Sequence, residues 1–424
     1  MHSPPLLDGA RRALIVLFVV SVFNYIDRFV LSVVLPAIKS DLALTDTALG
    51  AVATAFTLSY VLFGIPFAGL ADRHSRKAII AVSLALWSAM TAASGLAQNF
   101  WQLAVARILV GVGEAGATPP AHSMIADYFP RARRARALSI YGIGAPVGLI
   151  IGFGAASWLV ETYDWRITFL ALGLPGVLFA LFCYAVLKEP PRGYADGLRV
   201  QEAPPTIVTT LTTLLRSRSF CHTAFATSLY TVVYIAVVTW LPSYFVRSFA
   251  IGLAEVGVWL ALSVGVSQLI GMLSAGVVAD SLAARGLRWY GLIPALAMFV
   301  SAPLLAFVFW TDNPLLAALV LAPAFLISIF QGPPSFAIVQ AIAAVRMRAM
   351  AVALFLLIVN LLGATLGPLL TGWLSDRFVA TAGEDSLKWA LIVICLVFGL
   401  WSGLHYLLAA RHLEGELNTN DKNE

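Results

Sequence analysis

Residues 13–35 read ALIVLFVVSVFNYIDRFVLSVVL, a continuous apolar run that ends one residue before Pro36. A helix crosses the hydrocarbon core of a membrane in about 20 residues, so this run is long enough to span it. Barrel strands would instead give segments of about 10 residues with alternating polarity. The run therefore predicts a membrane-spanning helix that carries Asn24, Asp27 and Arg28 in its middle.

The same pattern continues along the 424 residues, of which 60% are hydrophobic and 12% charged. Soluble domains are about 45–50% apolar and about 25% charged, so a soluble globule is excluded. The apolar runs predict twelve spans, and the expected fold class is an all-α membrane protein. The spans are expected near residues 13–36, 47–71, 78–98, 101–126, 136–160, 165–187, 219–246, 254–279, 290–311, 314–341, 347–375 and 387–410.

A polar stretch with four prolines, residues 188–218, divides the chain into an N-terminal six-helix bundle (1–187) and a C-terminal one (219–424). The halves resemble each other. The second span of the first half closes on GIPFAGLAD at 64–72, and the second span of the other half closes on GMLSAGVVAD at 271–280. Strings of Gly and Pro, which permit close helix approach, recur in the fifth span of each half. This repetition predicts two pseudo-symmetric bundles that arose by internal duplication.

The basic residues indicate the topology. In the twelve-span arrangement, twenty of the 27 Lys and Arg residues fall on the side that holds both termini and the linker, and five on the other. Cytoplasmic loops carry the excess of Lys and Arg, so both termini are expected in the cytoplasm. The net charge of +5 is thus a topology signal, and no nucleic-acid partner is expected.

No enzymatic or metal-binding motif is present in the sequence. It contains no Gly-x-Ser-x-Gly elbow, no His-Glu-x-x-His and no phosphate-cradling Gly-Lys-Ser/Thr loop. The three cysteines fall in or at the edge of apolar segments and have no metal-ligand spacing. We expect neither an enzyme, nor a cofactor, nor a metal centre.

Four ionisable residues lie deep in predicted spans: Asp27 and Arg28 in the first, Arg107 and Glu114 in the fourth. At a rise of about 1.5 Å per residue, Asp27 and Arg107 lie at a similar depth, and Glu114 is two turns further on the same helix face. Charges inside a membrane face a cavity or a partner, so we expect these four, with Asn24, to meet. The alternative is a static ion-pair network that fixes helix packing.

An anionic substrate that bound Arg28 or Arg107 would take that guanidinium from its carboxylate and favour protonation of the acid. Glu114 is our first choice for proton coupling and Asp27 the second. In the second half, Tyr230, Tyr234, Gln268, Gln331 and Asn360 are candidates for the opposite wall of the cavity, although each is also consistent with packing. Such a site suits a solute with an anionic head and an apolar body.

A charged loop follows the second span and is a candidate cytoplasmic gate. It contains Asp72, Arg73, Arg76 and Lys77, and Asp280 occupies the matching place in the second half. Asp72 can cap the next helix or pair with Arg136, which would make a breakable latch between alternating states. The plain alternative is a loop that only sets the topology.

The residues of this loop and of the fourth span resemble the major facilitator superfamily. AGLADRHSRK at 68–77 is similar to the family's Gly-x-Leu-Ala-Asp-Arg-x-Gly-Arg-Lys motif, with departures at Ala68 and Ser75. RILVGVG at 107–113 is similar to the family's Arg-x-x-x-Gly-x-Gly motif, which the resemblance ties to proton transfer. The Gly/Pro string of the fifth span matches the exporter motif only in part.

Within the superfamily, NYIDR at 24–28 followed by Pro36, together with Gly113-Glu114-Ala115, resembles the spinster branch. Members of that branch carry lysolipids or sphingosine phosphate. The resemblance implies that Asp27, Arg28, Arg107 and Glu114 belong to the central substrate and proton site. We expect a proton-coupled secondary transporter for an amphipathic anion, a monomer in the plasma (inner) membrane, whose partners are its substrate, protons and membrane lipids. Sugar-acid and aromatic-acid proton symporters have similar first spans and are the main alternative. A drug exporter or a passive lipid scramblase is a further one.

Overall fold

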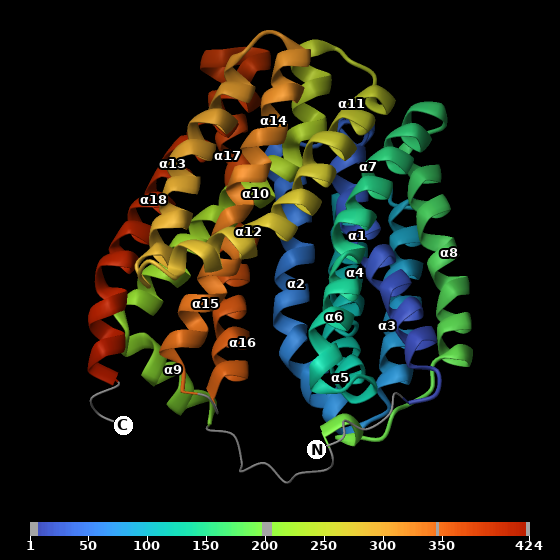
Figure 1. Ribbon diagram of the computed structural model, residues 1–424. Coiled ribbons are helices and arrows are strands. Elements are labelled where there is room, and N and C mark those ends of the chain that lie inside the picture. The colour runs from blue at the N-terminus through green and yellow to red at the C-terminus, as the bar shows by residue number, and fades with distance from the viewer. Residues whose placement is uncertain (1–6, 197–205, 345–346, 421–424) are drawn as a thin grey trace. The chain divides into compact units, whose positions relative to one another are not determined.

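The computed structural model describes residues 7–196, 206–344 and 347–420, and these residues form helices and no strand (Figure 1). In the described chain, ten helical stretches are long and apolar enough to cross a membrane. One of them, residues 350–416, contains the turn Gly383–Asp385 and so provides two crossings. The fourth expected span is split into two shorter helices at residues 116 and 117. The helices therefore agree with the predicted twelve spans.

The chain divides into two compact units. Unit 1 comprises Met1–Gln201 and Ile251–Ala261. Its helices are α1 (Ala10–Asp41), α2 (Asp46–Arg73), α3 (Arg76–Ser94), α4 (Phe100–Ala115), α5 (Thr118–Tyr128), α6 (Arg131–Gly142), α7 (Gly144–Thr162), α8 (Trp165–Val186) and α11 (Leu253–Leu260), with the short 3₁₀ turn Tyr194–Asp196.

Unit 2 comprises Glu202–Ala250 and Leu262–Glu424. Its helices are α9 (Ile207–Arg216), α10 (Arg218–Phe249), α12 (Ser267–Ala283), α13 (Trp289–Trp310), α14 (Pro314–Ser328), α15 (Gly332–Ile342), α16 (Arg348–Val359), α17 (Thr365–Ala382) and α18 (Ser386–Asn420). The 3₁₀ turn Ile329–Gln331 joins α14 to α15, and the π-helical turn Asn360–Ala364 joins α16 to α17. A second π-helical turn, Ala261–Val266, precedes α12. The boundary between the units lies inside the predicted linker, and residues 251–261 group with unit 1.

Polar residues between the apolar runs cap the N-termini of several helices. The side chains of Thr45, Asn99 and Asp164 each accept a hydrogen bond from the backbone N–H three residues later, at the starts of α2, α4 and α8. Ser217 does the same for α10. These bonds satisfy amides that have no partner within the helix. These four breaks between apolar runs are therefore helix N-caps in the structure.

The Gly-containing strings of the two halves make equivalent contacts. A Cβ atom on Gly148 of α7 would lie 2.7 Å from the carbonyl oxygen of Val22 on α1. In unit 2, a Cβ atom on Gly367 of α17 would lie 2.6 Å from the carbonyl oxygen of Val232 on α10. Both distances are shorter than atomic contact allows, so only glycine lets these backbones approach. The fifth span of each half thus packs against the first span of the same half.

Other helix pairs repeat this pattern. In unit 1, α3 packs along α8, and α2 packs along α4. In unit 2, α13 packs along α18, and α12 packs against α14 and the turn that follows it. Each pair occupies equivalent places in the predicted order of spans. The repeat of contacts supports the internal duplication that the sequence predicts.

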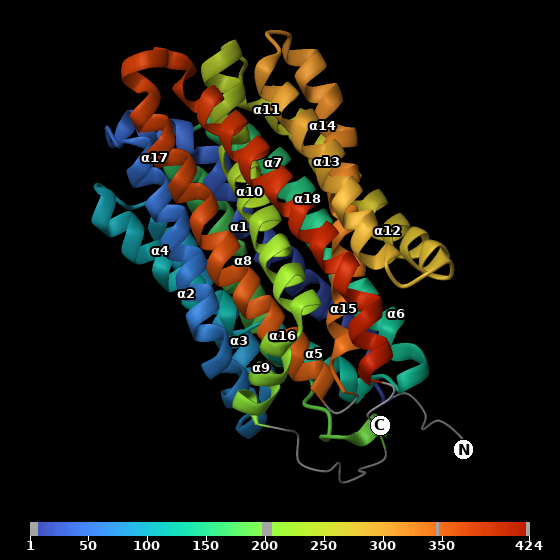
Figure 2. The ribbon, with the colours of Figure 1, turned by 90° about the vertical axis from the view of Figure 1, so that its left-hand side faces the viewer.

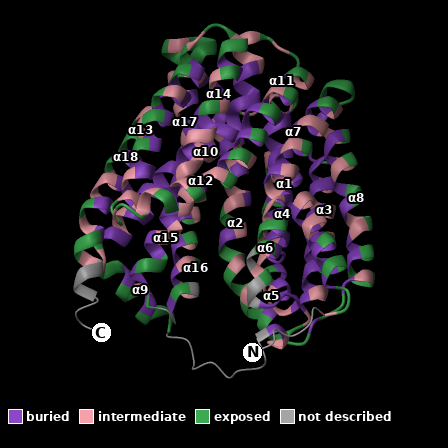
Figure 3. Cartoon of the chain, in the orientation of Figure 1, coloured by how far each residue is buried: buried purple, intermediate pink, exposed green. Residues whose placement is uncertain are grey.

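The outward faces of the helices are apolar. Figure 3 shows buried residues on the inner helix faces and exposed residues on the outer ones. Large apolar side chains are exposed on helices of both units, among them Trp101, Leu178, Leu273 and Val277. A soluble protein rarely exposes large contiguous apolar surface, whereas lipid covers it at no cost. The exterior is that of a membrane protein.

Candidate functional site

The four deep charges meet between α1 and α4 in unit 1. Asp27 is 2% exposed, and Arg107 and Glu114 are fully buried. Arg28 Nε donates to Glu114 Oε2 at 2.8 Å, which forms an ion pair between the two helices. The set has two acids and two guanidiniums, so its formal charge is zero. The sequence predicted this meeting of charges, and the structure confirms it.

Aromatic rings surround the guanidinium of Arg28. Its Cζ lies 4.3 Å from the ring centroid of Tyr60 and 5.1 Å from that of Tyr25. Phe56 lies beneath both guanidiniums, 5.9 Å from Arg28 and 5.1 Å from Arg107. The negative face of an aromatic ring attracts a cation, more strongly where water is excluded. These rings stabilise the arginines without neutralising them, so each remains able to bind an anion.

Arg107 has unused hydrogen-bonding capacity. Its Nη2 donates to the backbone carbonyl of Asp27 at 3.2 Å. Its Nε and Nη1, one carboxylate oxygen of Asp27 and one of Glu114 are buried and have no hydrogen-bond partner in the described structure. Buried polar groups in proteins are nearly always paired. Unpaired donors and acceptors gathered in one place are the mark of a site that binds a ligand, water or protons.

Two residues of α3 extend this site and were missed from the sequence. Trp87 and Thr91 interact with the carboxyl group of Asp27, yet Trp87 Nε1 and Thr91 Oγ1 complete no hydrogen bond of ordinary geometry. Asn24 lies beside Glu114, and its Nδ2 is also unpaired. Ser88, Thr91 and Ser94, which recur every three residues in the third span, were the available signal.

The predicted residues of unit 2 are brought together only in part. Gln268 Nε2 donates to Tyr234 OH, and the rings of Tyr230 and Tyr234 stack with centroids 6.0 Å apart. Both tyrosines line a small cavity with Ser301 and Ser328. Asn360 does not join them in the described contacts, and its Nδ2 donates to the carbonyl of Leu356 one turn earlier at 2.8 Å.

Gln331 belongs to a buried polar network centred on Tyr406, a residue that the sequence did not single out. Tyr406 OH lies 2.8 Å from Gln331 Oε1, 2.7 Å from Thr227 Oγ1 and 2.9 Å from Ser335 Oγ. Tyr406 is fully buried. The network connects α10, α15 and α18 and satisfies its own polar groups, so it stabilises helix packing in unit 2.

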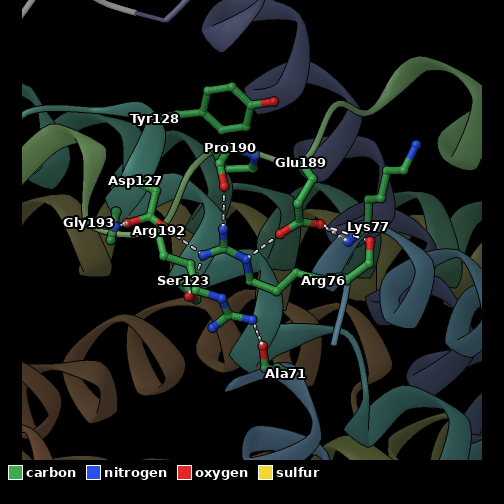
Figure 4. A network of polar contacts seen from close by, with 12 residues as sticks. Ala71, Arg76, Lys77, Ser123, Asp127, Tyr128, Glu189, Pro190, Arg192 and Gly193 are labelled. Carbon is green, nitrogen blue, oxygen red and sulfur yellow. Dashed lines mark hydrogen bonds and ion pairs between the residues drawn. The ribbon is translucent and has the colours of Figure 1, made fainter. Parts of the chain in front are cut away.

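Arg76 is the centre of a second polar network at the loop that follows α2 (Figure 4). Arg76 is 1% exposed and uses all three of its nitrogens. Nε donates to Glu189 Oε1 at 2.7 Å, Nη2 to the carbonyl of Pro190 at 2.9 Å, and Nη1 to Ser123 at 2.8 Å and to Asp127. A buried arginine is tolerated where its donors are paired in this way.

Residues 188–193 form a strap over this end of unit 1. Glu189 also accepts hydrogen bonds from Ser75 Oγ and from the backbone N–H of Lys77, each at 3.0 Å. Arg192 Nη2 donates to the carbonyl of Ala71 at 2.7 Å, and Gly193 N donates to Asp127 Oδ1 at 2.9 Å. Burial raises the pKa of Glu189. The hydrogen bonds from the Lys77 N–H, Arg76 and Ser75 outweigh this effect and hold the pKa of Glu189 below its usual value.

The side chains of the other predicted gating residues do not join this network, to which Lys77 contributes only its backbone N–H. Asp72 and Arg136 are both exposed, and no ion pair joins them in the described contacts. Arg73 is exposed, Lys77 Nζ lies 4.7 Å from the ring centroid of Tyr184, and Asp280 in unit 2 accepts from Tyr290 OH at 3.5 Å. The partners of Arg76, namely Asp127 and Glu189, were missed, although Asp127 is an acid beside a strongly basic segment.

Residues 17–368 match the profile of the Major Facilitator Superfamily. The chain belongs to this superfamily. The match covers both units and agrees with the twelve helical spans and with the repeated helix contacts. Major facilitators are membrane transporters, so the site between α1 and α4 is to be interpreted as part of a transporter.

Individual relatives in the superfamily include efflux and spinster proteins. An MFS-type efflux pump of Mycolicibacterium smegmatis is 32% identical over 410 residues, which cover 95% of this chain and 94% of the relative. Protein spinster homolog 1 of Xenopus tropicalis is 31% identical over 430 residues, with 94% and 80% covered. The resemblance to the spinster branch that the sequence predicted is thereby confirmed.

A solved structure shares the fold of this major facilitator. It is the crystal structure of a bacterial homologue of the human lysosomal transporter Spinster, in an inward-facing and unoccupied conformation. The TM-score is 0.89 at 24% identity, over 97% of this chain and 99% of that chain. The fold class, an all-α membrane protein with the two pseudo-symmetric six-helix bundles of the superfamily, is therefore confirmed.

Proposed function

We propose that this protein is a proton-coupled secondary active transporter that carries an amphipathic anion, such as a lysolipid or a sphingosine-phosphate-like lipid. The observation that carries the proposal is the neutral buried set in unit 1. It combines the Arg28–Glu114 ion pair with an Arg107 that has two unpaired nitrogens. Transporters of this architecture bind substrate near the membrane midplane and expose it to each side in turn.

The anionic head group binds the guanidiniums in this mechanism. Arg107 offers Nε and Nη1, which can bind a phosphate or carboxylate in the bidentate geometry that arginine favours. An anion that also engages Arg28 competes with Glu114 for the same Nε. Asn24, which lies beside Glu114, offers a further amide donor.

Proton uptake follows from loss of the ion pair. A carboxylate left without its partner in a buried site carries a large free-energy penalty. Glu114 relieves that penalty by taking up a proton, so substrate and proton bind together. Asp27 is the second carrier, because it is buried beside Arg107 and one of its oxygens is unpaired. Release of the substrate restores the Arg28–Glu114 pair and expels the proton.

The aromatic and amide residues of unit 2 are proposed to accommodate the apolar body of the substrate. Tyr230, Tyr234 and Phe325 form an aromatic group, in which the rings of Tyr234 and Phe325 have centroids 5.9 Å apart. Gln268 fixes Tyr234 by a hydrogen bond. We keep Gln331 and Asn360 as further contributors, although the side-chain oxygen of Gln331 accepts from Tyr406 OH and the amide of Asn360 donates to the carbonyl of Leu356.

We also propose how the chain is divided and how it lies in the membrane. The bundles comprise residues 1–187 and 219–424 and are joined by a linker at 188–218, with both termini and the linker in the cytoplasm. The protein acts as a monomer in the plasma membrane. Asp72, Arg73, Arg76, Lys77, Arg136 and Asp280 line the cytoplasmic gate in this proposal.

Proteoliposomes with an imposed proton gradient test the proposal. We expect the wild type to accumulate a lysolipid or sphingosine phosphate against its gradient. Glu114→Gln should abolish accumulation yet permit exchange. Glu384→Gln, which changes an exposed acid in a loop of unit 2, is the matched control and should transport normally. Gradient-driven accumulation in the Glu114 variant would refute its role in coupling.

The substrate alternatives are separated in the same assay. Saturable uptake of a small sugar acid or aromatic acid, with none of the lysolipid, would assign a small-organic-anion symporter. Equilibration of lipids across the bilayer without any gradient, unchanged in Glu114→Gln, would assign a passive scramblase. Extrusion of a cationic drug would assign an exporter. Each result contradicts the amphipathic-anion proposal.

A further inference from the structure

Three of the six histidines of the chain gather where α10 and α18 lie side by side in unit 2 (Figure 2). His222 is in the second turn of α10, and His405 and His412 lie seven residues apart, hence on one face of α18. None of them belongs to the charged site in unit 1. All three are partly exposed, so water and ions can reach them.

Two of these histidines face each other through matching atoms. His222 Nδ1 and His405 Nδ1 lie 2.9 Å apart, with ring centroids separated by 5.0 Å. Both nitrogens have lone pairs in the same plane as the ring, so only one proton fits between them. One imidazole donates and the other accepts when no ion is present.

The same spacing fits two ligands of one metal ion. Zinc binds imidazole nitrogen at about 2.0–2.1 Å in tetrahedral geometry, which places two ligand nitrogens about 3.3 Å apart. The observed separation of 2.9 Å differs from this by an amount that small ring rotations supply. A metal ion would replace the shared proton and use the lone pairs of both nitrogens.

Neighbouring side chains hold the rings in this arrangement. The ring of Phe225 packs edge-on against His405, with centroids 4.7 Å apart, and Trp401 packs against Phe225. His412 stacks on His222 with its plane inclined by only 8° and centroids 6.0 Å apart. Restricted rings lose less entropy when an ion binds, so this packing preorganises the pair.

The end of α18 is also fixed to the beginning of α10. Glu416 Oε2 accepts from Ser217 Oγ at 2.6 Å, and Glu416 Oε1 accepts from the backbone N–H of Arg218 at 2.8 Å. A carboxylate at a helix N-terminus is stabilised by the unpaired amides there. This contact sets the register of the two helices one turn away from His222, and thus the distance between the histidines.

We propose that His222 and His405 form a two-histidine site for a divalent transition-metal ion, with Zn²⁺, Cu²⁺ and Ni²⁺ as the ions that imidazole favours. The described residues contain no group of three or more His, Cys, Asp or Glu side chains placed to hold a metal. Water therefore completes the coordination. The ion bridges the first and last membrane spans of unit 2 and stabilises that unit, independently of the transported substrate.

Metal binding by the purified full-length protein tests the site. We expect calorimetry to show one Zn²⁺ per chain, and His222→Ala or His405→Ala to lower the affinity at least tenfold. With Cu²⁺, electron paramagnetic resonance should show hyperfine coupling to two imidazole nitrogens in the wild type and to one in either variant. The rise of Tm with Zn²⁺ should be larger in the wild type than in the His222→Ala and His405→Ala variants.

Control variants keep the result specific. His412→Ala removes the stacked neighbour and should reduce the affinity less than threefold, and His122→Ala in unit 1 should leave it unchanged. His405→Gln, which preserves a hydrogen bond to His222, replaces the alanine variant if that one does not fold. Absence of saturable binding, or an unchanged affinity in the His222 and His405 variants, overturns the proposal. An equal loss in His412→Ala overturns the assignment to this pair.

Discussion

At the scale of single residues, the two arginines of the charged site differ in their bonding. Arg28 is paired with Glu114, whereas the guanidinium of Arg107 donates one hydrogen bond, to a backbone carbonyl, and keeps two nitrogens unpaired. The first is suited to an exchange of partners and the second to direct capture of an anion. The depths of the residues along two helices were predictable from the sequence, because the rise per residue is constant.

Arg107→Ala should lower the affinity for an anionic lysolipid more than tenfold, because it removes the unpaired donors of the site. Arg107→Lys should recover only part of this loss, since an ammonium group cannot make a bidentate contact. An uncharged monoacylglycerol of equal chain length, titrated in parallel, reports the apolar contribution. An equal loss of affinity for both lipids would contradict a role for Arg107 in binding the anionic head.

The partner of each charge was not predictable in the same way. The sequence placed Asp27 and Arg107 at one depth, and they do meet, but through the backbone carbonyl of Asp27. The rotation of each helix about its axis decides which atoms face each other, and packing elsewhere in the bundle sets that rotation. The contributions of Trp87 and Thr91 were missed for the same reason.

At the scale of elements, the close contacts at Gly148 and Gly367 and the strap at residues 188–193 join segments that are distant in the sequence. The apolar runs predicted where the helices lie, because a membrane requires each span to satisfy its own backbone. They did not predict the π-helical turns at Ala261–Val266 and Asn360–Ala364. Such turns arise from packing constraints within a continuous apolar segment. The hydropathy of the segment is the same with or without them, so it does not predict where they lie.

Gly148→Ala should destabilise the protein by about 1–3 kcal/mol, the usual cost of overpacking, since its Cβ would collide with the backbone of α1. Gly154→Ala on the same helix is the matched control, because nothing lies within 4 Å of its would-be Cβ. We expect that control to be neutral or stabilising. Thermal unfolding in detergent compares them, and equal Tm values would contradict close packing at Gly148.

Glu189→Gln should loosen the strap over residues 188–193. Because contacts in the folded protein hold the pKa of Glu189 below its unfolded value, the carboxylate stabilises the protein at neutral pH. This contribution is lost as the pH falls through the lowered pKa. The Tm difference between wild type and variant should therefore be present at pH 7 and shrink toward pH 3.5.

The exposed Glu384→Gln serves as the reference for that series. It alters the net charge by the same amount but changes no contact of the strap. A Tm difference for Glu189→Gln that is the same at every pH would show that its ionised form contributes nothing to the fold.

At the scale of the whole molecule, the duplicated pattern of contacts connects the sequence repeat to the two units. The sequence predicted equivalent spans from two repeats, namely the strings at 64–72 and 271–280 and the Gly strings in α7 and α17. Equivalent pairs of helices do pack together in each unit. The grouping of residues 251–261 with unit 1 was not foreseen. Hydropathy predicts where a span lies in the sequence, but it does not predict which other helices the span packs against.

The distribution of basic residues predicts the orientation of the molecule. A fluorescent protein fused after residue 424 should fluoresce, because it matures in the cytoplasm. Alkaline phosphatase inserted at Gly383, between α17 and α18, should be active, because that loop is expected outside. Insertion at Gly286, between α12 and α13, is the matched control and should give no activity. The reverse pattern would contradict the proposed topology.

The hydrogen bonds of Arg76 limit which amino acids can replace it. Its three nitrogens reach a carboxylate of the strap, a carbonyl oxygen and two acceptors on α5, in different directions within one plane. A lysine would preserve the charge and supply only one donor atom. In evolutionary terms, Arg76→Lys counts as a conservative replacement because it keeps the charge. At this position it would nevertheless remove most of the hydrogen bonds of the side chain. The set of tolerated amino acids here is narrower than a loop at the end of a helix would imply.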